Sequence, residues 1–413
     1  MYRDESNSRP CKTDTSKADC KGGKVKRPIN KNEIKNSMRP EGVVTWAEID
    51  LNAIEYNIKA YKKHINPLVE VIAVVKANAY GHGAVQVAQA ALSCGAGRLA
   101  VHRAIEGVEL RQAGIEAPIL IMGYTPSDGA KLIVENDLTP SLITHEFAQA
   151  LSGQAQALGR RVPVHIKVDS GMGRYGLQPT EVSQFAESLN GLPGLYLEGL
   201  FTHFSTADSL DQSHTLNQLA VFKDVVTTLE TTGIHVPLVH AANSAAAMRF
   251  PQAQFNAIRL GLAMYGMNPS DEWPPVFEIH PALTLKSCIS RVSRLPIGTG
   301  ISYGRTFITP EDMEVGLVPV GYGDGFHRIL SNRGAVLVHG KRASLLGRVC
   351  MDQFVIDLRG IPDVQQDDEV VLIGSQGQER ITAEEVAGLA ETINYEVTTS
   401  LLPRVRRVYF RGK

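Results

Sequence analysis

The chain has 413 residues and a formal net charge of −1, and 43% of its residues are hydrophobic while 21% are charged. This length allows two domains with a large core, and the balanced charge gives no reason to expect a nucleic-acid or membrane partner. No apolar run is long enough to cross a bilayer, and the first residues lack the apolar stretch of a secretory leader. Five scattered cysteines predict neither a disulfide framework nor a metal site, so we expect a cytoplasmic protein.

The first 42 residues differ in composition from the rest of the chain. They contain 11 Lys or Arg against 6 Asp or Glu, many Ser, Asn and Thr, and few large apolar side chains. Such a segment cannot bury enough apolar surface to fold, so residues 1–42 are predicted to be a disordered tail. The basic excess fits solvation better than a binding arm. The next segment, residues 43–52, is rich in β-formers and is predicted to be a strand that joins the C-terminal domain.

Residues 53–280 repeat one pattern, in which a short apolar run, a polar turn and an amphipathic stretch follow one another. The amphipathic stretches include residues 84–94, 180–189 and 212–232, and several end near a glycine that would cap a helix. Eight alternating units predict a TIM-like (β/α)8 barrel, with an open doubly wound sheet as the alternative. The predicted strands are Val71–Val75, Leu99–Val101, Ile119–Met122, Thr139–Ile143, Val164–Val168, Leu197–Phe201, Leu238–His240 and Ala257–Arg259.

The pattern changes after Pro281. Short strand-like runs are now separated by Gly and Pro turns, without long amphipathic stretches between them. Residues 281–413 are therefore predicted to form a second, mainly β domain, so that the fold class is an α/β barrel followed by a β-rich C-terminal domain. The strands predicted here are Leu283–Val292, Val315–Val320, Ala335–Val338, Gln353–Leu358 and Glu369–Ile373.

Polar residues follow the predicted barrel strands at their C-terminal ends, which is where barrels of this kind carry their function. Lys76 ends the first strand, and an ammonium group there needs either a carboxylate partner or a covalent use. Schiff-base formation is the commonest covalent use of such a lysine. The other polar or small residues at this end are Lys167, Arg174, His203, Asn243, Ser244, Arg259 and Gly261.

The loops after the seventh and eighth strands contain Ser244 and Gly261. In a barrel these loops often bind a phosphate, for which a hydroxyl and an approachable backbone N–H are suitable donors. A phosphate site and a reactive lysine at one barrel mouth fit pyridoxal 5'-phosphate (PLP), which has a phosphate at one end and an aldehyde at the other. A sugar-phosphate aldolase would use the same two features. Taken alone, Lys76 could also be a solvated strand end, and Lys167 could pair with Asp169.

Several long motifs resemble those of bacterial alanine racemases, which are PLP enzymes of fold type III. The stretch Val74-Val-Lys76-Ala-Asn-Ala-Tyr80-Gly-His-Gly resembles the family's PLP-attachment motif. Further matches follow in the family's order and cover roughly residues 43–411. The resemblance implies a PLP barrel with a β domain, and an enzyme that interconverts L- and D-alanine. The further matching motifs surround Lys167, His203, Ser244, Arg259, Tyr303, Tyr322 and Met351.

The resemblance also implies two catalytic bases on opposite faces of the cofactor. Lys76 would form the Schiff base with PLP and exchange the α-proton of the substrate on one face. Tyr303 would exchange it on the other face, supplied by the partner subunit of a homodimer. Inverting the α-carbon requires proton exchange on both faces, and each base needs a pKa shifted toward the working pH.

The remaining matches imply contacts with the cofactor and with a small amino-acid substrate. Arg259 would donate to the pyridine nitrogen and keep it unprotonated, which makes PLP a weaker electron sink and suppresses transamination. Lys167 resembles a lysine that is carbamylated in many members and that steadies Arg174. The implied cofactor-binding residues are Lys76, Tyr80, Arg174, His203, Asn243, Ser244, Arg259, Gly261 and Leu262, and the implied substrate-binding residues are Arg174, Tyr322 and Met351.

One position departs from the family pattern. Many members carry a tyrosine a few residues after an Asn-Tyr-Glu-Val segment, whereas the aligned residue here is Pro403, which has no side-chain donor. We therefore expect a roomier pocket and some activity on serine, and a serine or broader amino-acid racemase is the alternative function. A PLP decarboxylase is disfavoured because its glycine-rich phosphate loop and cysteine-aspartate motif are absent from the sequence. A non-catalytic PLP-carrier protein would lack the second domain.

Overall fold

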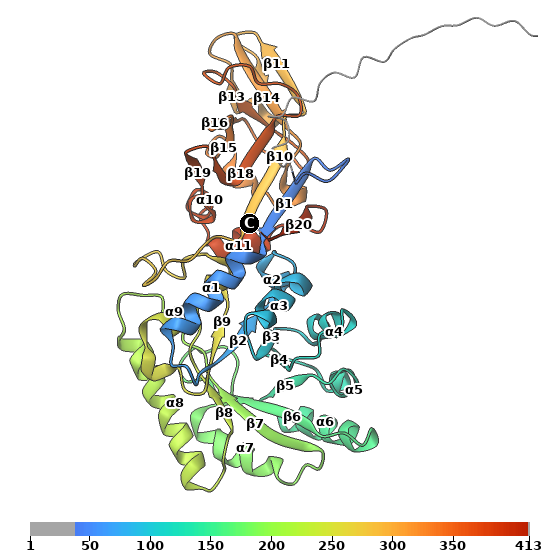
Figure 1. Cartoon of the computed structure of the whole chain (residues 1–413), viewed down its shortest axis with the longest axis vertical. Helices are drawn as coiled ribbons and strands as arrows, with labels where there is room; N and C mark the ends of the chain where they lie inside the picture. Colours follow the sequence, from blue (N-terminus) through green and yellow to red (C-terminus); the bar gives the residue numbers. More distant parts are fainter. Residues whose placement is uncertain (1–37, 412–413) are drawn as a thin grey trace, which may run out of the picture. The chain divides into compact units, whose positions relative to one another are not determined.

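The computed structural model describes residues 38–411, so the predicted disordered tail lies almost entirely outside the described residues. Eight parallel strands close into a barrel in chain order, which confirms the predicted barrel and excludes the open sheet (Figure 1). The barrel strands are β2 (Glu70–Val74), β3 (Arg98–Val101), β4 (Ile119–Ile121), β5 (Thr139–Leu142), β6 (Val162–Lys167), β7 (Leu195–Phe201), β8 (Leu238–His240) and β9 (Ala257–Leu260).

Helices cover the outside of this barrel (Figure 1). Most barrel strands are continuous runs of buried residues, because the helices pack on one face and side chains fill the interior. Gly95 and Gly233 have φ angles of 86° and 79° just after α3 and α8, as expected of capping glycines. None of the helices in residues 38–411 has the length and apolar composition needed to cross a bilayer. The main barrel helices are α1 (Leu51–His64), α3 (Ala84–Ser93), α4 (Ala104–Gln112), α5 (Ala130–Glu135), α6 (His145–Ala157), α7 (Val182–Leu189), α8 (Ser213–Thr231) and α9 (Ser244–Arg249).

The C-terminal part is mainly β, as predicted. Its ten-stranded sheet has the order β11-β14-β17-β16-β15-β18-β10-β1-β20, with β19 paired to β18. The strands are β1 (Thr45–Asp50), β10 (Leu283–Cys288), β11 (Arg291–Leu295), β14 (Met313–Val318), β15 (Ala335–Val338), β16 (Lys341–Leu346), β17 (Phe354–Asp357), β18 (Glu369–Gln376), β19 (Glu379–Ile381) and β20 (Arg406–Phe410). A small sheet pairs β12 (Gly300–Ile301) with β13 (Phe307–Ile308), and two short helices are α10 (Ala383–Leu389) and α11 (Asn394–Thr399).

Strand β1 belongs to the β-rich sheet although it precedes the barrel in the chain. It pairs antiparallel with β10 and parallel with β20. Directly after it, the Asp50 carboxylate accepts from the backbone N–H groups of Asn52 and Ala53 at 2.8 and 3.3 Å, which caps the first turn of α1. One short segment therefore completes the sheet and starts the barrel.

The predicted strand Leu283–Val292 proves to be two strands. The backbone N–H of Ile289 donates to Asp368, whereas that of Ser290 donates to Leu317, so the chain changes its neighbour at this point. No glycine or proline marks the break, and a local pattern therefore cannot reveal it. Strands β16 and β20 were not predicted, because exposed charged residues interrupt their apolar pattern.

Candidate functional site

A cavity of about 490 Å³, which we call the barrel cavity, opens where the C-terminal ends of the barrel strands meet. Its volume is within the range of small-molecule sites. Ten residues singled out in the sequence line it, and they come from both early and late parts of the barrel. They are Lys76, Tyr80, Lys167, Arg174, His203, Asn243, Ser244, Arg259, Gly261 and Leu262.

Lys76 begins the short segment α2 (Lys76–Tyr80), which turns in an unusual direction. The φ angles of Ala77, Asn78, Ala79 and Tyr80 are all 52°, in the left-handed region. This region costs a residue with a Cβ atom about 1–2 kcal/mol. Four such residues in a row persist only where the surrounding structure holds them, and backbone strain of this kind concentrates at functional sites.

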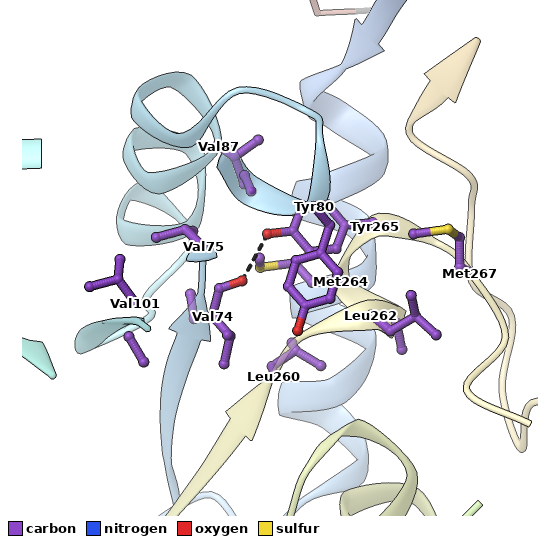
Figure 2. Packing of buried hydrophobic residues seen from close by; sticks show 14 of the residues in the cluster. Val74, Val75, Tyr80, Val87, Val101, Leu260, Leu262, Met264, Tyr265 and Met267 are labelled. Carbon is purple, nitrogen blue, oxygen red and sulfur yellow. Dashed lines mark hydrogen bonds between the residues drawn. The ribbon is translucent and has the colours of Figure 1, made fainter. Parts of the chain in front are cut away.

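Neighbouring side chains hold this left-handed turn on two sides. Glu106 Oε1 accepts from the N–H of Ala77 at 2.6 Å, while its other oxygen accepts from two N–H groups just before α4. On the opposite side, the Tyr265 hydroxyl donates to the carbonyl of Val74 at 2.8 Å, within the packed cluster that Figure 2 shows. The ring of Tyr80 lies 4.9 Å from that of Tyr265. The backbone that presents Lys76 is thus held by contacts within the chain.

The surroundings of the Lys76 amine favour its neutral form. Burial and the positive charge of Arg174 lower the pKa of Lys76, while Glu106 opposes them. The amine nitrogen lies 5.8 Å from the centroid of the Tyr80 ring. A larger neutral fraction makes the amine both a better nucleophile and a better base at neutral pH.

Tyr80, Ser244 and Gly261 meet at one corner of the barrel cavity. The Ser244 hydroxyl oxygen accepts from the N–H of Gly261 at 3.0 Å. A Cβ atom on Gly261 would lie 2.9 Å from the Tyr80 hydroxyl oxygen, so a glycine is needed for this close approach. Two hydroxyls beside a backbone that carries no Cβ atom at Gly261 suit a phosphate group. The residues present therefore fit PLP, with its phosphate at this corner and its aldehyde at Lys76.

Two further observations change the expected composition of this corner. Asn243 lines the cavity, but its side-chain oxygen accepts from the N–H of Ala246 at 2.9 Å and caps α9. Tyr395, from α11, also lines the cavity, and its ring centroid lies 6.1 Å from that of Tyr80. Burial raises the pKa of Tyr395 to about 12, so its hydroxyl keeps a proton to donate. Pro403 is exposed and is not among the lining residues, which gives the predicted roomier pocket no support.

Arg259 lies buried in the barrel wall and borders the cavity. Its guanidinium donates to the carbonyl oxygens of Thr202 and Ala241 at 2.6 and 2.8 Å. It also lies 3.3 Å from Nδ1 of His203. Burial lowers the pKa of Arg259 to about 9, which leaves the group protonated at neutral pH. Burial and Arg259 hold the pKa of His203 well below its usual range, so this ring is neutral and can accept.

Lys167 ends β6 beside Arg174. Its amine lies 5.1 Å from the centroid of the Tyr175 ring, and within residues 38–411 no ion pair joins it to Asp169. The Asp169 carboxylate instead accepts from four backbone N–H groups of the following loop, at 2.7 to 3.0 Å. Burial, together with the charges of Arg259 and Arg174, lowers the pKa of Lys167 to about 7. A substantial fraction of this amine is therefore neutral near pH 7.

The three predicted residues from the β-rich domain lie elsewhere. Tyr303, Tyr322 and Met351 line a shallow hollow on that domain, which we call the tyrosine surface. Their exposed fractions are 72%, 42% and 53%, which is high for two aromatic rings and a methionine. The tyrosine surface and the barrel cavity share no lining residue. One copy of the chain, as described, does not bring the Tyr303 phenol to Lys76.

Several other side chains that line the barrel cavity were not identified as site residues from the sequence, among them His102, Tyr124 and Tyr395. His102 directly follows β3, and Tyr124 comes shortly after β4. The strand-end rule that found Lys76 would have found both. Burial and the charge of Lys76 lower the pKa of His102. Tyr395 belongs to the second domain, and no local pattern indicates that it reaches the barrel.

Comparison with known families matches both parts of the chain. The family described as "Alanine racemase, N-terminal domain" matches residues 49–269, and the family described as "Alanine racemase, C-terminal domain" matches residues 282–409. The alanine racemase of Halothermothrix orenii is 43% identical over 365 residues, which is 88% of this chain and 96% of that protein. That of Desulforamulus reducens is 46% identical over 367 residues, covering 88% of this chain and 98% of that protein.

A solved structure gives the same result. The crystal structure of alanine racemase from Bacillus anthracis with bound L-Ala-P superposes with a TM-score of 0.86 at 42% sequence identity. The match covers 91% of this chain and 97% of that chain. The similarity therefore extends through both the barrel and the β-rich domain.

Proposed function

Because this chain belongs to the alanine racemase family, we propose that Lys76 of one subunit and Tyr303 of a second exchange the α-proton of alanine on opposite faces of PLP. The chain is a PLP-dependent enzyme that interconverts L- and D-alanine, and the close relatives do not favour a serine or broader racemase. The observation that carries the two-base proposal is that the two candidate bases lie in different parts of the chain. Lys76 lines the barrel cavity, whereas Tyr303 is exposed on the tyrosine surface.

Inversion of the α-carbon requires that a proton leave one face and that another arrive on the opposite face. When bound, PLP delocalises the negative charge left on that carbon. The Lys76 amine is suited to exchange the proton on its face because burial and Arg174 lower its pKa. The phenol of Tyr303 would exchange it on the other face.

The cofactor would be held at two ends by neutral donors and by one cation. Tyr80, Ser244 and the backbone at Gly261 and Leu262 would bind the phosphate. Arg259 would donate to the pyridine nitrogen. Since an arginine remains protonated, this nitrogen would stay unprotonated, which limits electron withdrawal and so suppresses transamination.

We propose that Arg174 binds the substrate carboxylate and that a carbamate on Lys167 steadies it. The neutral Lys167 nitrogen would form a bond to the carbon of CO₂ and release a proton. This replaces a cation beside Arg174 with an anion that can accept its hydrogen bonds. The pKa near 7 and the engagement of Asp169 with backbone N–H groups both support this proposal.

The tyrosine surface would complete the barrel cavity of a second copy. In this homodimer, Tyr322 and Met351 of the partner would contribute to substrate binding beside Tyr303. The exposure of these three side chains in one copy supports the arrangement. A shared site requires that the active form be at least a dimer. The cytoplasmic location stays a prediction, and we propose that the D-alanine product supplies cell-wall peptides.

Mixing two inactive variants tests the shared site. Lys76→Ala and Tyr303→Phe holoenzymes are each expected to be nearly inactive. In a mixed dimer, one site carries both substitutions and the other carries neither. Random reassociation of equal amounts should therefore restore roughly a quarter of the wild-type activity. If each subunit contained a complete site, mixing would restore none.

The readout is the decay of the optical rotation of L-alanine to zero, without release of gas or keto acid. Borohydride treatment should leave the cofactor covalently attached to the wild-type protein, whereas the reduced cofactor should be removable by dialysis from Lys76→Ala. L-Serine under the same conditions is the matched substrate. Serine turnover equal to that of alanine would contradict a preference for alanine and would favour the broader racemase.

A further inference from the structure

A row of hydrogen-bonded polar side chains crosses the buried interior of the barrel, starting at Arg259. Arg259 Nη1 lies 2.7 Å from His240 Nδ1, and His240 Nε2 lies 3.1 Å from His165 Nδ1. His165 Nε2 lies 3.1 Å from Glu198 Oε2. The arginine and both imidazoles are almost fully buried, and each of the four residues comes from a different barrel strand. We call these four residues the relay.

The relay ends in a cluster of charges. Glu198 Oε2 also accepts from Arg98 Nη1 at 2.9 Å, and Arg98 pairs with Glu70 at 3.3 Å. Glu70 and Arg98 are the first residues of β2 and β3. They therefore mark the N-terminal end of the barrel, opposite the barrel cavity. The relay connects that end to the arginine at the cavity.

The positions of the hydrogens in the relay follow from its two ends. Arg259 can only donate, so His240 Nδ1 must accept. A neutral His240 then carries its hydrogen on Nε2 and donates to His165, which in turn donates from Nε2 to the Glu198 carboxylate. Burial lowers the pKa of both histidines, so both rings are neutral, as this arrangement requires. Every hydrogen bond points from Arg259 toward Glu198.

The backbone of β6 and β7 is shaped around the relay. The pairing register shifts between Val164 and His165 and leaves Glu198 without a counterpart on β6, which is a bulge of the kind that re-aims a side chain. A Cβ atom on Gly199 would lie 2.5 Å from Nδ1 of His165, so the glycine leaves room for the imidazole. A bulge and a glycine both weaken a strand. Their presence together indicates that the polar contact has a use.

Arg259 needs such a contact because it is a buried cation. Its other hydrogen-bond partners within residues 38–411 are the neutral ring of His203 and three backbone carbonyls, and it lies 5.4 Å from the centroid of the Phe201 ring. Hydrogen-bonded imidazoles polarise one another in a low-dielectric interior. Glu198 can therefore stabilise the guanidinium charge through two rings. A carboxylate placed directly beside the cofactor would instead compete for the donors of Arg259.

We propose that Glu198 is a positioning residue for Arg259 and that it acts through His165 and His240. It orients the guanidinium and balances its charge from the far end of the barrel. This inference rests on the proposed contact between Arg259 and the pyridine nitrogen, and it extends that role to three residues that do not touch the cofactor.

The test compares two holoenzyme variants that each lose one negative charge from the same cluster. Glu198→Gln keeps an oxygen that can accept from His165 but removes the charge. We expect kcat to fall about tenfold, as for other supporting partners of a site, with the KM for alanine unchanged within about twofold. The pH dependence of the absorbance of the bound cofactor should shift as well. The control, Glu70→Gln, touches Arg98 but not the relay, and it should change kcat by less than about twofold.

The surrounding charges are the same in both variants. Lys76, Lys167, Arg174 and His203 face the cavity end of the relay, and Arg98 faces the other end. A change in kcat and in cofactor absorbance that occurs only in Glu198→Gln would therefore be an effect of the relay. Equal changes in both variants would overturn the inference, because they would show that the effect depends only on losing one negative charge and not on which glutamate loses it. An unchanged kcat and absorbance in Glu198→Gln would also overturn it.

A second measurement is made on the wild-type holoenzyme and does not depend on Glu198→Gln. Nitrogen NMR of the wild-type holoenzyme should show His165 and His240 as neutral rings with the hydrogen on Nε2, assigned by comparison with His165→Asn and His240→Asn. A charged ring or the opposite tautomer would overturn the inference even if Glu198→Gln failed to fold. A wild-type protein that did not racemise alanine would contradict the proposed function itself, whereas active wild-type enzyme with an unaffected Glu198→Gln variant would contradict only the relay.

Discussion

The barrel cavity and the tyrosine surface differ in how far a single chain completes them. In the barrel cavity, Lys76 stands on a left-handed turn held by Glu106 and Tyr265, and Arg259 is tied to backbone carbonyls. On the tyrosine surface, Tyr303 is 72% exposed and lies apart from the barrel cavity. The residues for cofactor binding can therefore be organised within one chain, whereas proton exchange on the second face would need another chain.

Replacing Lys76 is the change with the largest expected effect. Lys76→Ala removes both the attachment point for PLP and one base, so racemisation should fall by about four orders of magnitude. The phosphate corner remains, and PLP should still bind, but reversibly. Activity is measured by the optical rotation of L-alanine, and attachment by dialysis and absorbance. Retention of PLP through dialysis after borohydride treatment would show that another group forms the bond.

Replacing Tyr303 tests the role of the tyrosine surface. Tyr303→Phe should lower kcat by about two to four orders of magnitude because it removes one acid–base group. The affinity for PLP and the free energy of unfolding should stay near wild type, since the side chain is largely exposed. Cofactor titration and urea unfolding check these two expectations. A loss of PLP as large as the loss of activity would mean that the two regions are not separable in this way.

Lys167 provides a test in pH. Its pKa is lowered to about 7 in the folded protein, whereas an unfolded lysine titrates near about 10.4. Between these values the unfolded chain binds more protons, so the free energy of unfolding should rise with pH across this window. Lys167→Met removes that dependence, and its stability relative to wild type should be greatest below pH 7. Urea unfolding at pH 6, 8 and 10 in bicarbonate-free buffer measures it.

The same residue offers a direct check of the carbamate. With ¹³C-labelled bicarbonate, the wild-type holoenzyme should show a carbamate resonance that Lys167→Met lacks. A stability difference that did not change with pH would contradict the lowered pKa. A spectrum without the resonance would contradict the proposed modification.

The smallest expected effect concerns Tyr395, the residue through which the C-terminal domain reaches the barrel cavity of its own chain. Tyr395→Phe removes one hydroxyl near the phosphate corner, so the Kd for PLP should rise by roughly 2- to 12-fold, the equivalent of one hydrogen bond. Tyr80→Phe serves as the matched comparison at the same corner. Fluorescence titration with PLP measures both. A Kd unchanged by Tyr395→Phe would confine phosphate binding to the barrel.

Much of the fold was predictable because local pattern and tertiary structure agree in a barrel. Most barrel strands are buried on both faces, so their apolar runs are visible without knowledge of their neighbours. The β-rich domain was predicted less completely. The break at Ile289 and the strand β16 depend on which distant strand lies alongside, and that information is not local.

The barrel, the β-rich domain and ten of the residues that line the barrel cavity could be predicted from the sequence. Eight of the ten follow from their position near strand ends, which is a property of the local pattern, whereas Tyr80 and Leu262 follow only from the resemblance to a family. Four features became visible only in the tertiary structure. They are the left-handed turn after Lys76, the use of Asn243 as a helix cap, the position of Tyr395 in the lining of the barrel cavity, and the relay from Arg259 to Glu198. Each of these depends on contacts between residues far apart in the chain or on backbone geometry that such contacts hold in place. Their energies appear only when the segments meet.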